Sequence, residues 1–252
     1  MMRIAEIFRS IQGEGRLTGV ESVFVRTSGC NLRCRFCDTP YASWSPEGEE
    51  LSVGAILERV ESLRRDSAGE RQCPRPRPVS QNERGVEVSH VILTGGEPML
   101  FDEIAELTAE LRRRGWHITI ETSGTIDRPV ACDLMSISPK LSNSNPSVDQ
   151  YPAWAERHRL RRHAPEVIRW LIGAYDFQLK FVVDAADDCR EVEAYVAELP
   201  EVEPSRVMLM PQGVEAAALA EKAAWLVPYC AARGWTFCPR RQIEWFGGRR
   251  GR

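Results

Sequence analysis

The feature that most constrains this chain is a group of three cysteines, Cys30, Cys34 and Cys37, in the spacing Cys-x3-Cys-x2-Cys. Each iron of a four-iron, four-sulfur cube takes one external ligand, so three thiolates leave one iron open for a substrate or cosubstrate. One short loop with this spacing can wrap one cluster. Spacing alone also permits a three-cysteine zinc site completed by a distant residue, or unconnected thiols.

Composition indicates a globular chain. It has 252 residues, of which 43% are hydrophobic and 27% charged, and this length is ordinary for one α/β domain. The formal net charge of −3 gives no general argument for nucleic acid or membrane as a partner. No apolar run approaches the roughly 18 residues of a membrane span.

The eight cysteines indicate metal binding in a reducing, cytoplasmic setting more than a disulfide framework, because three are so tightly clustered. The first residues include Arg3, Glu6, Arg9 and Glu14 and do not predict a signal peptide. The other five cysteines show no second cluster spacing. We expect them to be small buried hydrophobes or inert surface thiols: Cys73, Cys132, Cys189, Cys230 and Cys238.

Short β-rich runs alternate with amphipathic segments, which predicts parallel strands joined by right-handed crossovers. Ligands of such sheets lie at the carboxyl ends of the strands, where the polar motifs of this chain occur. Pro228 is expected to kink or end the last helix. Strands are predicted at 23–25, 90–94, 116–122, 134–138, 178–183 and 207–210, and helices at 52–65, around 104–111, 188–197 and 215–232.

Residues 1–246 are predicted to form a single domain, and three stretches of the chain depart from the alternation of strands and helices. Residues 66–85 are polar and proline-rich, typical of a surface insertion. Residues 142–162 are polar and irregular, which favours a loop over the site. Residues 247–252 form a glycine–arginine tail that we expect to be a solvated end.

An aromatic residue, Phe36, immediately precedes Cys37, and the run Gly95-Gly96-Glu97-Pro98 ends a predicted strand. Together with the cysteine spacing, these features resemble the radical S-adenosylmethionine superfamily. The resemblance implies an α/β fold of the partial, open βα-barrel type. It also implies one [4Fe-4S] cluster per chain, whose open iron chelates the amino and carboxylate groups of S-adenosylmethionine. Reduction then yields a 5′-deoxyadenosyl radical.

Nearly the whole chain is similar, motif by motif, to the 7-carboxy-7-deazaguanine synthase family. The most discriminating match is the run Ser10-Ile11-Gln12-Gly13-Glu14-Gly15. The resemblance implies conversion of 6-carboxy-5,6,7,8-tetrahydropterin to 7-carboxy-7-deazaguanine with loss of ammonia, on a route to queuosine-type 7-deazapurines. Further matching segments lie at residues 37–39, 121–125, 138–140, 179–181 and 211–213.

The resemblance also implies which residues bind the cofactors. Cys30, Cys34 and Cys37 hold the cluster, Thr39 matches a Mg²⁺-binding position, and Glu97 accepts from the methionyl ammonium. Mg²⁺ at Thr39 would need waters and substrate oxygens to complete its octahedron. Gly95 and Gly96 lack side chains, which allows close approach of the backbone to S-adenosylmethionine. The remaining cosubstrate contacts are expected from Phe36, Asp38, Ser123, Ser138, Pro139, Lys140, Met210, Pro211, Gln212 and Gly213.

For the substrate, the family pattern places residues 11–14 (Ile11, Gln12, Gly13 and Glu14) against the pterin edge. Arg26 is expected to pair with the substrate carboxylate through its two-pronged guanidinium. Thr94 is expected to face the same cavity. No side chain is assigned as a catalytic acid or base, because the adenosyl radical performs the chemistry.

The implied partners are the pterin, a reductase such as flavodoxin or ferredoxin, and a second copy of the chain in a homodimer, without nucleic acid or membrane. Two other functions remain open: an activase that makes a glycyl radical on a protein partner, and a non-catalytic zinc-binding module. The chain differs from some family members near its C-terminus. Where they carry a histidine two positions before the glutamate of the last strand, this chain has Gln242, before Glu244.

Overall fold

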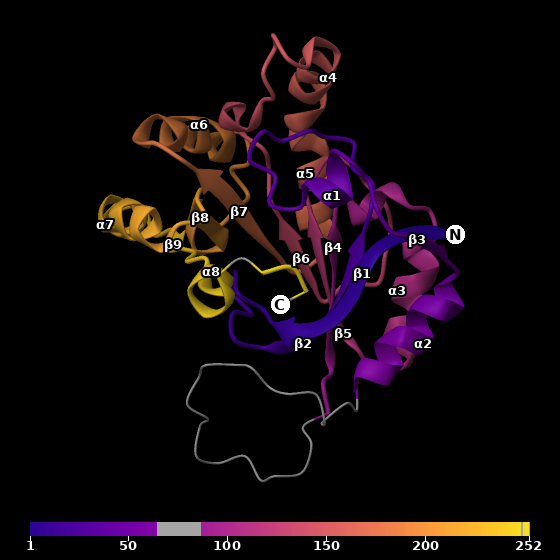
Figure 1. Ribbon diagram of the computed structural model, residues 1–252. Coiled ribbons are helices and arrows are strands. Elements are labelled where there is room, and N and C mark those ends of the chain that lie inside the picture. The colour runs from indigo at the N-terminus through magenta and orange to yellow at the C-terminus, as the bar shows by residue number, and fades with distance from the viewer. Residues whose placement is uncertain (65–86, 248, 252) are drawn as a thin grey trace, which may run out of the picture.

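A computed structural model describes residues 1–64, 87–247 and 249–251, and its core is one curved sheet of nine strands (Figure 1). The strand order is β3-β1-β2-β4-β5-β6-β7-β8-β9. The strands are β1 (Met2–Ile11), β2 (Glu21–Thr27), β3 (Glu49–Leu51), β4 (His90–Gly95), β5 (His117–Thr122), β6 (Leu134–Ile137), β7 (Phe177–Val183), β8 (Val207–Pro211) and β9 (Thr236–Phe237).

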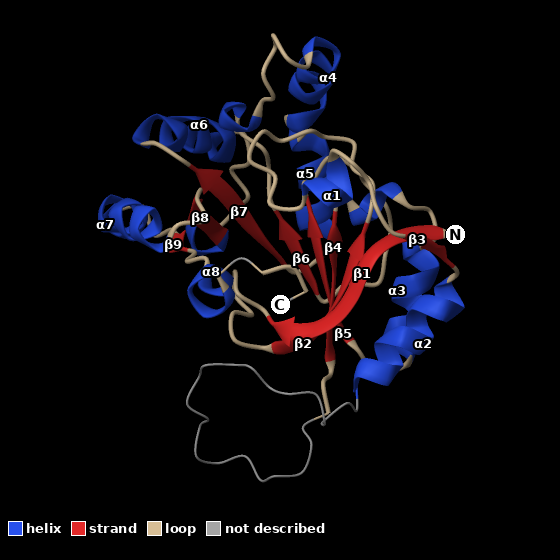
Figure 2. Ribbon diagram, in the orientation of Figure 1, coloured by secondary structure: helices blue, strands red, loops and turns tan. Residues whose placement is uncertain are grey.

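Helices cover the outer side of this curved sheet (Figure 2). Helices α2 and α3 pack against each other, α2 also against β1 and β2 and α3 against β5, whereas α5, α6 and α7 contact β6, β7 and β8 respectively. The helices are α1 (Pro40–Ser43), α2 (Val53–Arg64), α3 (Ile104–Arg113), α4 (Pro152–Arg162), α5 (Pro165–Ala174), α6 (Ala186–Ala197), α7 (Ala216–Ala231) and α8 (Arg241–Phe246), with short 3₁₀ turns at Pro98–Leu100, Ser142–Ser144 and Pro204–Arg206.

The predicted parallel pairing is confirmed from β2 through β9, and every predicted strand is present. Strands β6 and β8 are buried along their whole length, as parallel strands covered on both faces are. The exception is β1, which the sequence did not predict and which pairs antiparallel with β2 and β3. Most of its residues are only half-buried, so its sequence carries no clear apolar run.

Three sequence expectations are wrong. Residues 142–162 contain the helix α4 and are not irregular throughout. Of the two outcomes expected at Pro228, the early end is wrong, because the predicted helix is present as α7 and continues through Pro228 to Ala231. Gln242 lies on the helix α8, not before the end of a last strand.

Two other expectations concern stretches at the margins of the described chain. The proposed insertion at 66–85, with Cys73, lies outside the described residues. The end of the chain differs from the expected solvated tail: Arg250 forms ion pairs with Glu6 and Glu47, and its guanidinium lies 3.8 Å from the centre of the Tyr41 ring. Within the described part of the chain, no helix is long and apolar enough to cross a membrane.

The sheet does not close into a barrel, because β3 and β9 remain its two edges. Residues after β9 cross the open side and reach the loop that follows β1. The N–H of Arg241 donates to the carbonyl of Gly13 at 3.1 Å, and the N–H of Gly15 approaches Sγ of Cys238 at 3.2 Å. The loop after β1 is therefore held between the sheet and the C-terminal residues.

Candidate functional site

A cavity of about 420 Å³ lies on the inner side of the sheet, at the carboxyl ends of the parallel strands. Its wall includes all three clustered cysteines, Thr39 and residues from the end of each parallel strand from β2 to β8. Most residues singled out from the sequence line it: Ile11, Gln12, Gly13, Glu14, Arg26, Phe36, Asp38, Thr94, Gly95, Gly96, Ser123, Ser138, Lys140, Met210 and Gln212. The expected contacts that are not part of its wall are Glu97, Pro139, Pro211 and Gly213.

The three cysteines lie on one loop between β2 and α1. The N–H of Cys37 donates to the carbonyl of Cys34 at 3.3 Å, and Sγ of Cys37 lies 3.1 Å from Oγ of Ser43. Trp44 donates its indole N–H to the carbonyl of Cys34 at 3.0 Å, which fixes the outer side of the loop. The loop is thus shaped by hydrogen bonds that leave the three thiols facing one cavity.

All three thiols are free of disulfides. Burial raises the pKa of Cys30 to about 12 and that of Cys34 to about 11, so these groups stay protonated near neutral pH unless a metal replaces the proton. Across the described residues, no three His, Cys, Asp or Glu side chains are grouped closely enough to hold a single metal ion. The three thiols suit a multi-iron cluster because they lie on one short loop and line one cavity.

The glycine pair after β4 is required by backbone packing. Gly95 has a φ of +129°, and a Cβ there would lie 2.2 Å from the carbonyl oxygen of Thr27. A Cβ on Gly96 would lie 2.0 Å from the carbonyl oxygen of Gly29. The sequence predicted close approach of a cosubstrate at these positions. The structure adds that the approach of residues 27–29, just before Cys30, already excludes side chains there.

The Glu97 carboxylate lies fully buried behind the cavity. It accepts hydrogen bonds from the N–H of Met99, the hydroxyl of Thr122, and both the N–H and the hydroxyl of Ser123. These four donors hold the ends of β4 and β5 together. A ligand ammonium that reaches Glu97 would share its oxygens with them.

A second carboxylate, Glu121, faces the cavity from β5. One of its oxygens accepts from Nε2 of Gln12 at 2.9 Å and the other from the hydroxyl of Thr94 at 2.8 Å. The carboxylate is therefore held between the β1 loop and β4. It is placed to accept from ring N–H and amino groups of a heterocycle in the cavity.

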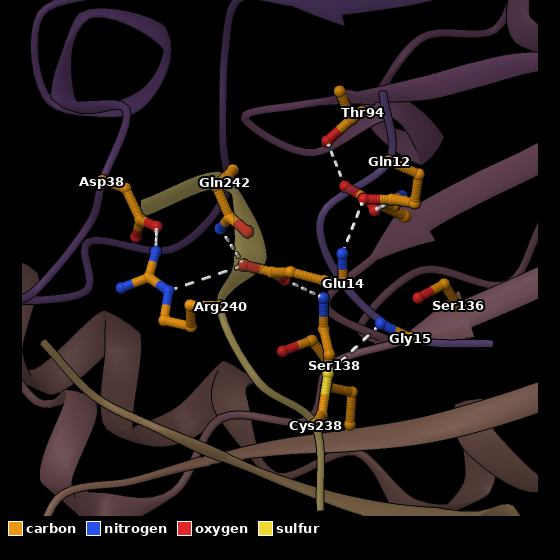
Figure 3. A network of polar contacts seen from close by, with 12 residues as sticks. Gln12, Glu14, Gly15, Asp38, Thr94, Ser136, Ser138, Cys238, Arg240 and Gln242 are labelled. Atoms are coloured by element: carbon orange, nitrogen blue, oxygen red, sulfur yellow. Dashed lines mark hydrogen bonds and ion pairs between the residues drawn. The ribbon is translucent and has the colours of Figure 1, made fainter. Parts of the chain in front are cut away.

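Figure 3 shows a network of polar and charged side chains around Glu14, which adjoins the Glu121 group because the N–H of Glu14 donates to Oε1 of Gln12 at 3.1 Å. Glu14 bonds to Lys180 and Gln242, and its Oε1 lies 3.5 Å from Nε of Arg240. Arg240 also pairs with Asp38, beside Cys37. Burial alone would raise the pKa of Glu14, but the charges of Lys180 and Arg240 lower it to about 2. The same network raises the pKa of Lys180 against the effect of its burial, so both groups stay charged.

Arg26, the expected partner of a substrate carboxylate, forms an ion pair in this structure through its Nε with Glu6, at 2.6 Å. Tyr41 donates its hydroxyl to the same glutamate oxygen at 2.9 Å. No partner of the terminal nitrogens of Arg26 is found among the described residues. Those nitrogens can bind a carboxylate while Glu6 keeps the guanidinium in place.

Thr39 and Lys140 provide further polar groups near the cysteines. The Thr39 hydroxyl stands at the start of α1 without capping it and approaches Sγ of Cys37 at 3.8 Å. Lys140 donates to the hydroxyl of Ser138 at 2.7 Å. Together they give this side of the cavity one cation and hydroxyl oxygens, which suit anionic and hydroxylated ligands.

Sequence reasoning missed several residues of the cavity as site residues. Glu121 and Lys180 lie in matched motifs, but their side-chain direction became clear only from the sheet. Nothing in the local sequence marks Arg240, because its partners are distant along the chain. Other unexpected residues of the wall are Phe8, Phe24, Leu32, Tyr41, Ser43, Thr122, Ser136, Val182, Val214, Gln242, Ile243, Arg249, Arg250 and Gly251.

Known proteins similar to this chain share both its sequence and its fold. No family model matches the chain. The 7-carboxy-7-deazaguanine synthase of Rhodopirellula baltica is 45% identical over 249 residues, covering 98% of this chain and 88% of that protein. The enzyme of the same name from Halobacterium salinarum is 39% identical over 249 residues, covering 95% and 88% respectively.

Two solved structures have a similar fold. QueE from Escherichia coli superposes with a TM-score of 0.59 at 22% identity, covering 95% of this chain and 94% of that one. Streptococcus suis SuiB, in a structure bound to S-adenosylmethionine, has a TM-score of 0.50 at 14% identity, covering 83% and 48%. The mixed α/β architecture with an open, mostly parallel sheet therefore agrees with the fold predicted from the sequence.

Proposed function

The chain belongs to the 7-carboxy-7-deazaguanine synthase family of radical S-adenosylmethionine lyases, and we propose that it converts 6-carboxy-5,6,7,8-tetrahydropterin to 7-carboxy-7-deazaguanine with loss of ammonia by radical ring contraction. The observation that carries this proposal is a single cavity in which the three cysteines of one loop face the carboxylate Glu121 and the guanidinium Arg26. The residues suited to a cofactor and those suited to a polar heterocyclic acid thus line the same cavity.

Cys30, Cys34 and Cys37 would hold the [4Fe-4S] cluster. With S-adenosylmethionine bound, that cluster supplies the 5′-deoxyadenosyl radical, and we propose that S-adenosylmethionine is regenerated in each cycle. Gly95, Gly96, Ser138 and Lys140 border the space beside the thiols, where the cosubstrate would lie.

The pterin would lie between Glu121 and Arg26. Glu121 accepts from the amino and ring N–H groups of the pterin, with Gln12 and Thr94 keeping its two oxygens in orientation. The terminal nitrogens of Arg26 bind the substrate carboxylate. These contacts would fix the pterin ring relative to the thiols. Holding the reacting groups in a fixed geometry lowers the entropic part of the barrier.

The Glu14 network would keep the β1 loop rigid around the substrate. Because Glu14, Lys180 and Arg240 are all buried and charged, each loses stabilisation if another moves. Thr39 would place Mg²⁺ beside the substrate oxygens, with waters completing the octahedron.

The experiment is an anaerobic incubation of the reconstituted protein with the pterin, S-adenosylmethionine and dithionite, with the product identified by mass spectrometry. We expect 7-carboxy-7-deazaguanine from the wild type and from Cys189→Ala, and neither product nor brown cluster absorption from Cys34→Ala. Iron-loaded wild type that leaves the pterin unchanged would refute the proposed reaction. Zinc without iron or sulfide would refute the cluster.

A further inference from the structure

Helix α4 packs directly on the loop that carries the three cysteines. The N–H of Arg33 donates to Nδ1 of the buried His158 at 3.1 Å, and the Arg33 guanidinium lies 3.9 Å from the centre of the Trp154 ring. Arg161 donates to the carbonyl of Asn31 at 3.4 Å. The outward side of α4 is therefore the protein surface adjoining the cysteine loop, and Figure 1 shows the helix at the outer edge of the molecule.

The exposed side of α4 presents two arginines around a leucine. Arg157, Leu160 and Arg161 are spaced i, i+3 and i+4 and are all exposed, Leu160 at 63%. We call these three residues the α4 face. Among the described residues Arg157 has no ion-pair partner, its guanidinium lying 5.4 Å from the centre of the Trp154 ring. Arg159, on the side of the helix toward Glu156, is instead bound to that residue.

The charge of this region is opposite to that of the whole chain. Residues 148–162 contain four arginines against two carboxylates, Asp149 and Glu156, whereas the formal net charge of the chain is −3. Arginine is enriched at protein interfaces relative to the rest of the surface, and Leu160 adds apolar contact area between the two arginines. The positive charge of the α4 face selects an acidic partner.

We propose that the α4 face docks an acidic one-electron carrier protein, which reduces the cluster held by the adjoining loop. This inference rests on the proposed function, since it needs the cluster. In the step the carrier is oxidised by one electron and the cluster is reduced by one, with no atom transferred. A second copy of the chain fits this face poorly, because a two-fold interface centred on it would bring its arginines against each other.

The test compares Arg157→Glu/Leu160→Gln, which leaves the contact of Arg161 with the cysteine loop intact, with a control that carries the same charge change elsewhere, Arg113→Glu on α3. Binding of oxidised flavodoxin to the cluster-loaded enzymes is measured by calorimetry at low and high salt. We expect the wild type and the control to bind with a Kd that rises with salt. The α4 variant should bind at least about tenfold more weakly at low salt and lose most of the salt dependence.

Turnover separates this inference from the proposed function. With dithionite, all three proteins should turn over equally, whereas with reduced flavodoxin only the α4 variant should slow. Equal flavodoxin binding by the two variants would overturn the docking site, as would loss of self-association in the α4 variant alone or binding of DNA in place of flavodoxin. Absence of pterin turnover with dithionite in the wild type would instead refute the proposed function.

Discussion

Arg240 joins three parts of the site that are far apart in the sequence. Its guanidinium pairs with Asp38 beside the last cysteine, lies near Glu14 on the β1 loop, and donates to the carbonyl of Gly213 at 2.6 Å. Only 5% of its side chain is exposed. A buried cation with several anionic partners is costly to remove, because its partners stay behind without compensation.

We therefore predict that Arg240→Gln lowers the free energy of unfolding by about 3 kcal/mol and lowers kcat/KM for the pterin more than tenfold. Arg241→Gln is the matched control, since Arg241 is exposed and its side chain pairs only with Glu244 among the described residues. That change should cost less than about 0.5 kcal/mol. Denaturant unfolding and steady-state kinetics measure both, and equal effects in the two variants would contradict the role of Arg240.

Thr39 gives a second prediction for a single residue. Its hydroxyl does not cap α1, so its removal should change the free energy of unfolding by less than about 1 kcal/mol. If the hydroxyl binds Mg²⁺, Thr39→Ala should lose most of the acceleration by Mg²⁺, and Thr39→Ser should keep it. Turnover against Mg²⁺ concentration at equal cluster content decides, and an unchanged response in Thr39→Ala would refute the metal role.

Single residues were predictable from the sequence where the chemistry is local. The cysteine spacing and the Ser10–Gly15 run were sufficient to identify two walls of the cavity. The sequence could not predict that Glu6 holds Arg26, or that Gln242 bonds to Glu14, because these contacts depend on how distant segments meet.

At the scale of elements, a buried histidine contributes to holding α4 on the cysteine loop. Nδ1 of His158 accepts from the N–H of Arg33, and Nε2 lies 2.9 Å from the hydroxyl of Ser144. This arrangement requires the neutral ring with its proton on Nε2. Burial, with Arg162 and Lys140 nearby, lowers the pKa of His158 to about 4.

The lowered pKa predicts a loss of stability in acid. The unfolded chain binds the proton near pH 6.5 and the folded chain only near pH 4, so the free energy of unfolding should fall as the pH drops through this window and should not change above it. The loss is on the order of 2–3 kcal/mol. His158→Gln can form both hydrogen bonds without titrating and should lose less. The measurement is the free energy of unfolding against pH for cluster-free wild type and cluster-free His158→Gln. An equal loss of stability in acid for both proteins would contradict the prediction.

The elements that the sequence predicted are those with regular burial. Strands β2, β4 and β6 to β8 are apolar over most of their length because they are covered on both faces. Helix α4 was missed because arginines and other polar residues make up most of it and its buried side is narrow, chiefly Ala155 and His158. The antiparallel β1 was missed because the alternation of strands and helices predicts only parallel pairs.

For the whole molecule, the open sheet and the C-terminal residues together border one cavity. The strands bring the cysteine loop, Glu121 and Lys180 to one edge. Residues 238–247 lie over the open side, and Arg250 reaches back to Glu6 beside Arg26. The presence of the cysteines, Glu121 and Arg26 in the wall of one cavity supports the central claim, that the cosubstrate and the pterin react in the same cavity.

The most direct test of that claim is an anaerobic incubation of the enzyme with the pterin deuterated at C6 and S-adenosylmethionine at a tenth of the substrate concentration. We predict several equivalents of 7-carboxy-7-deazaguanine per S-adenosylmethionine, one ammonia per product, and deuterium in the 5′ position of the recovered S-adenosylmethionine. Product that never exceeds the S-adenosylmethionine supplied, or deuterium that never leaves the pterin-derived carbon, would contradict it.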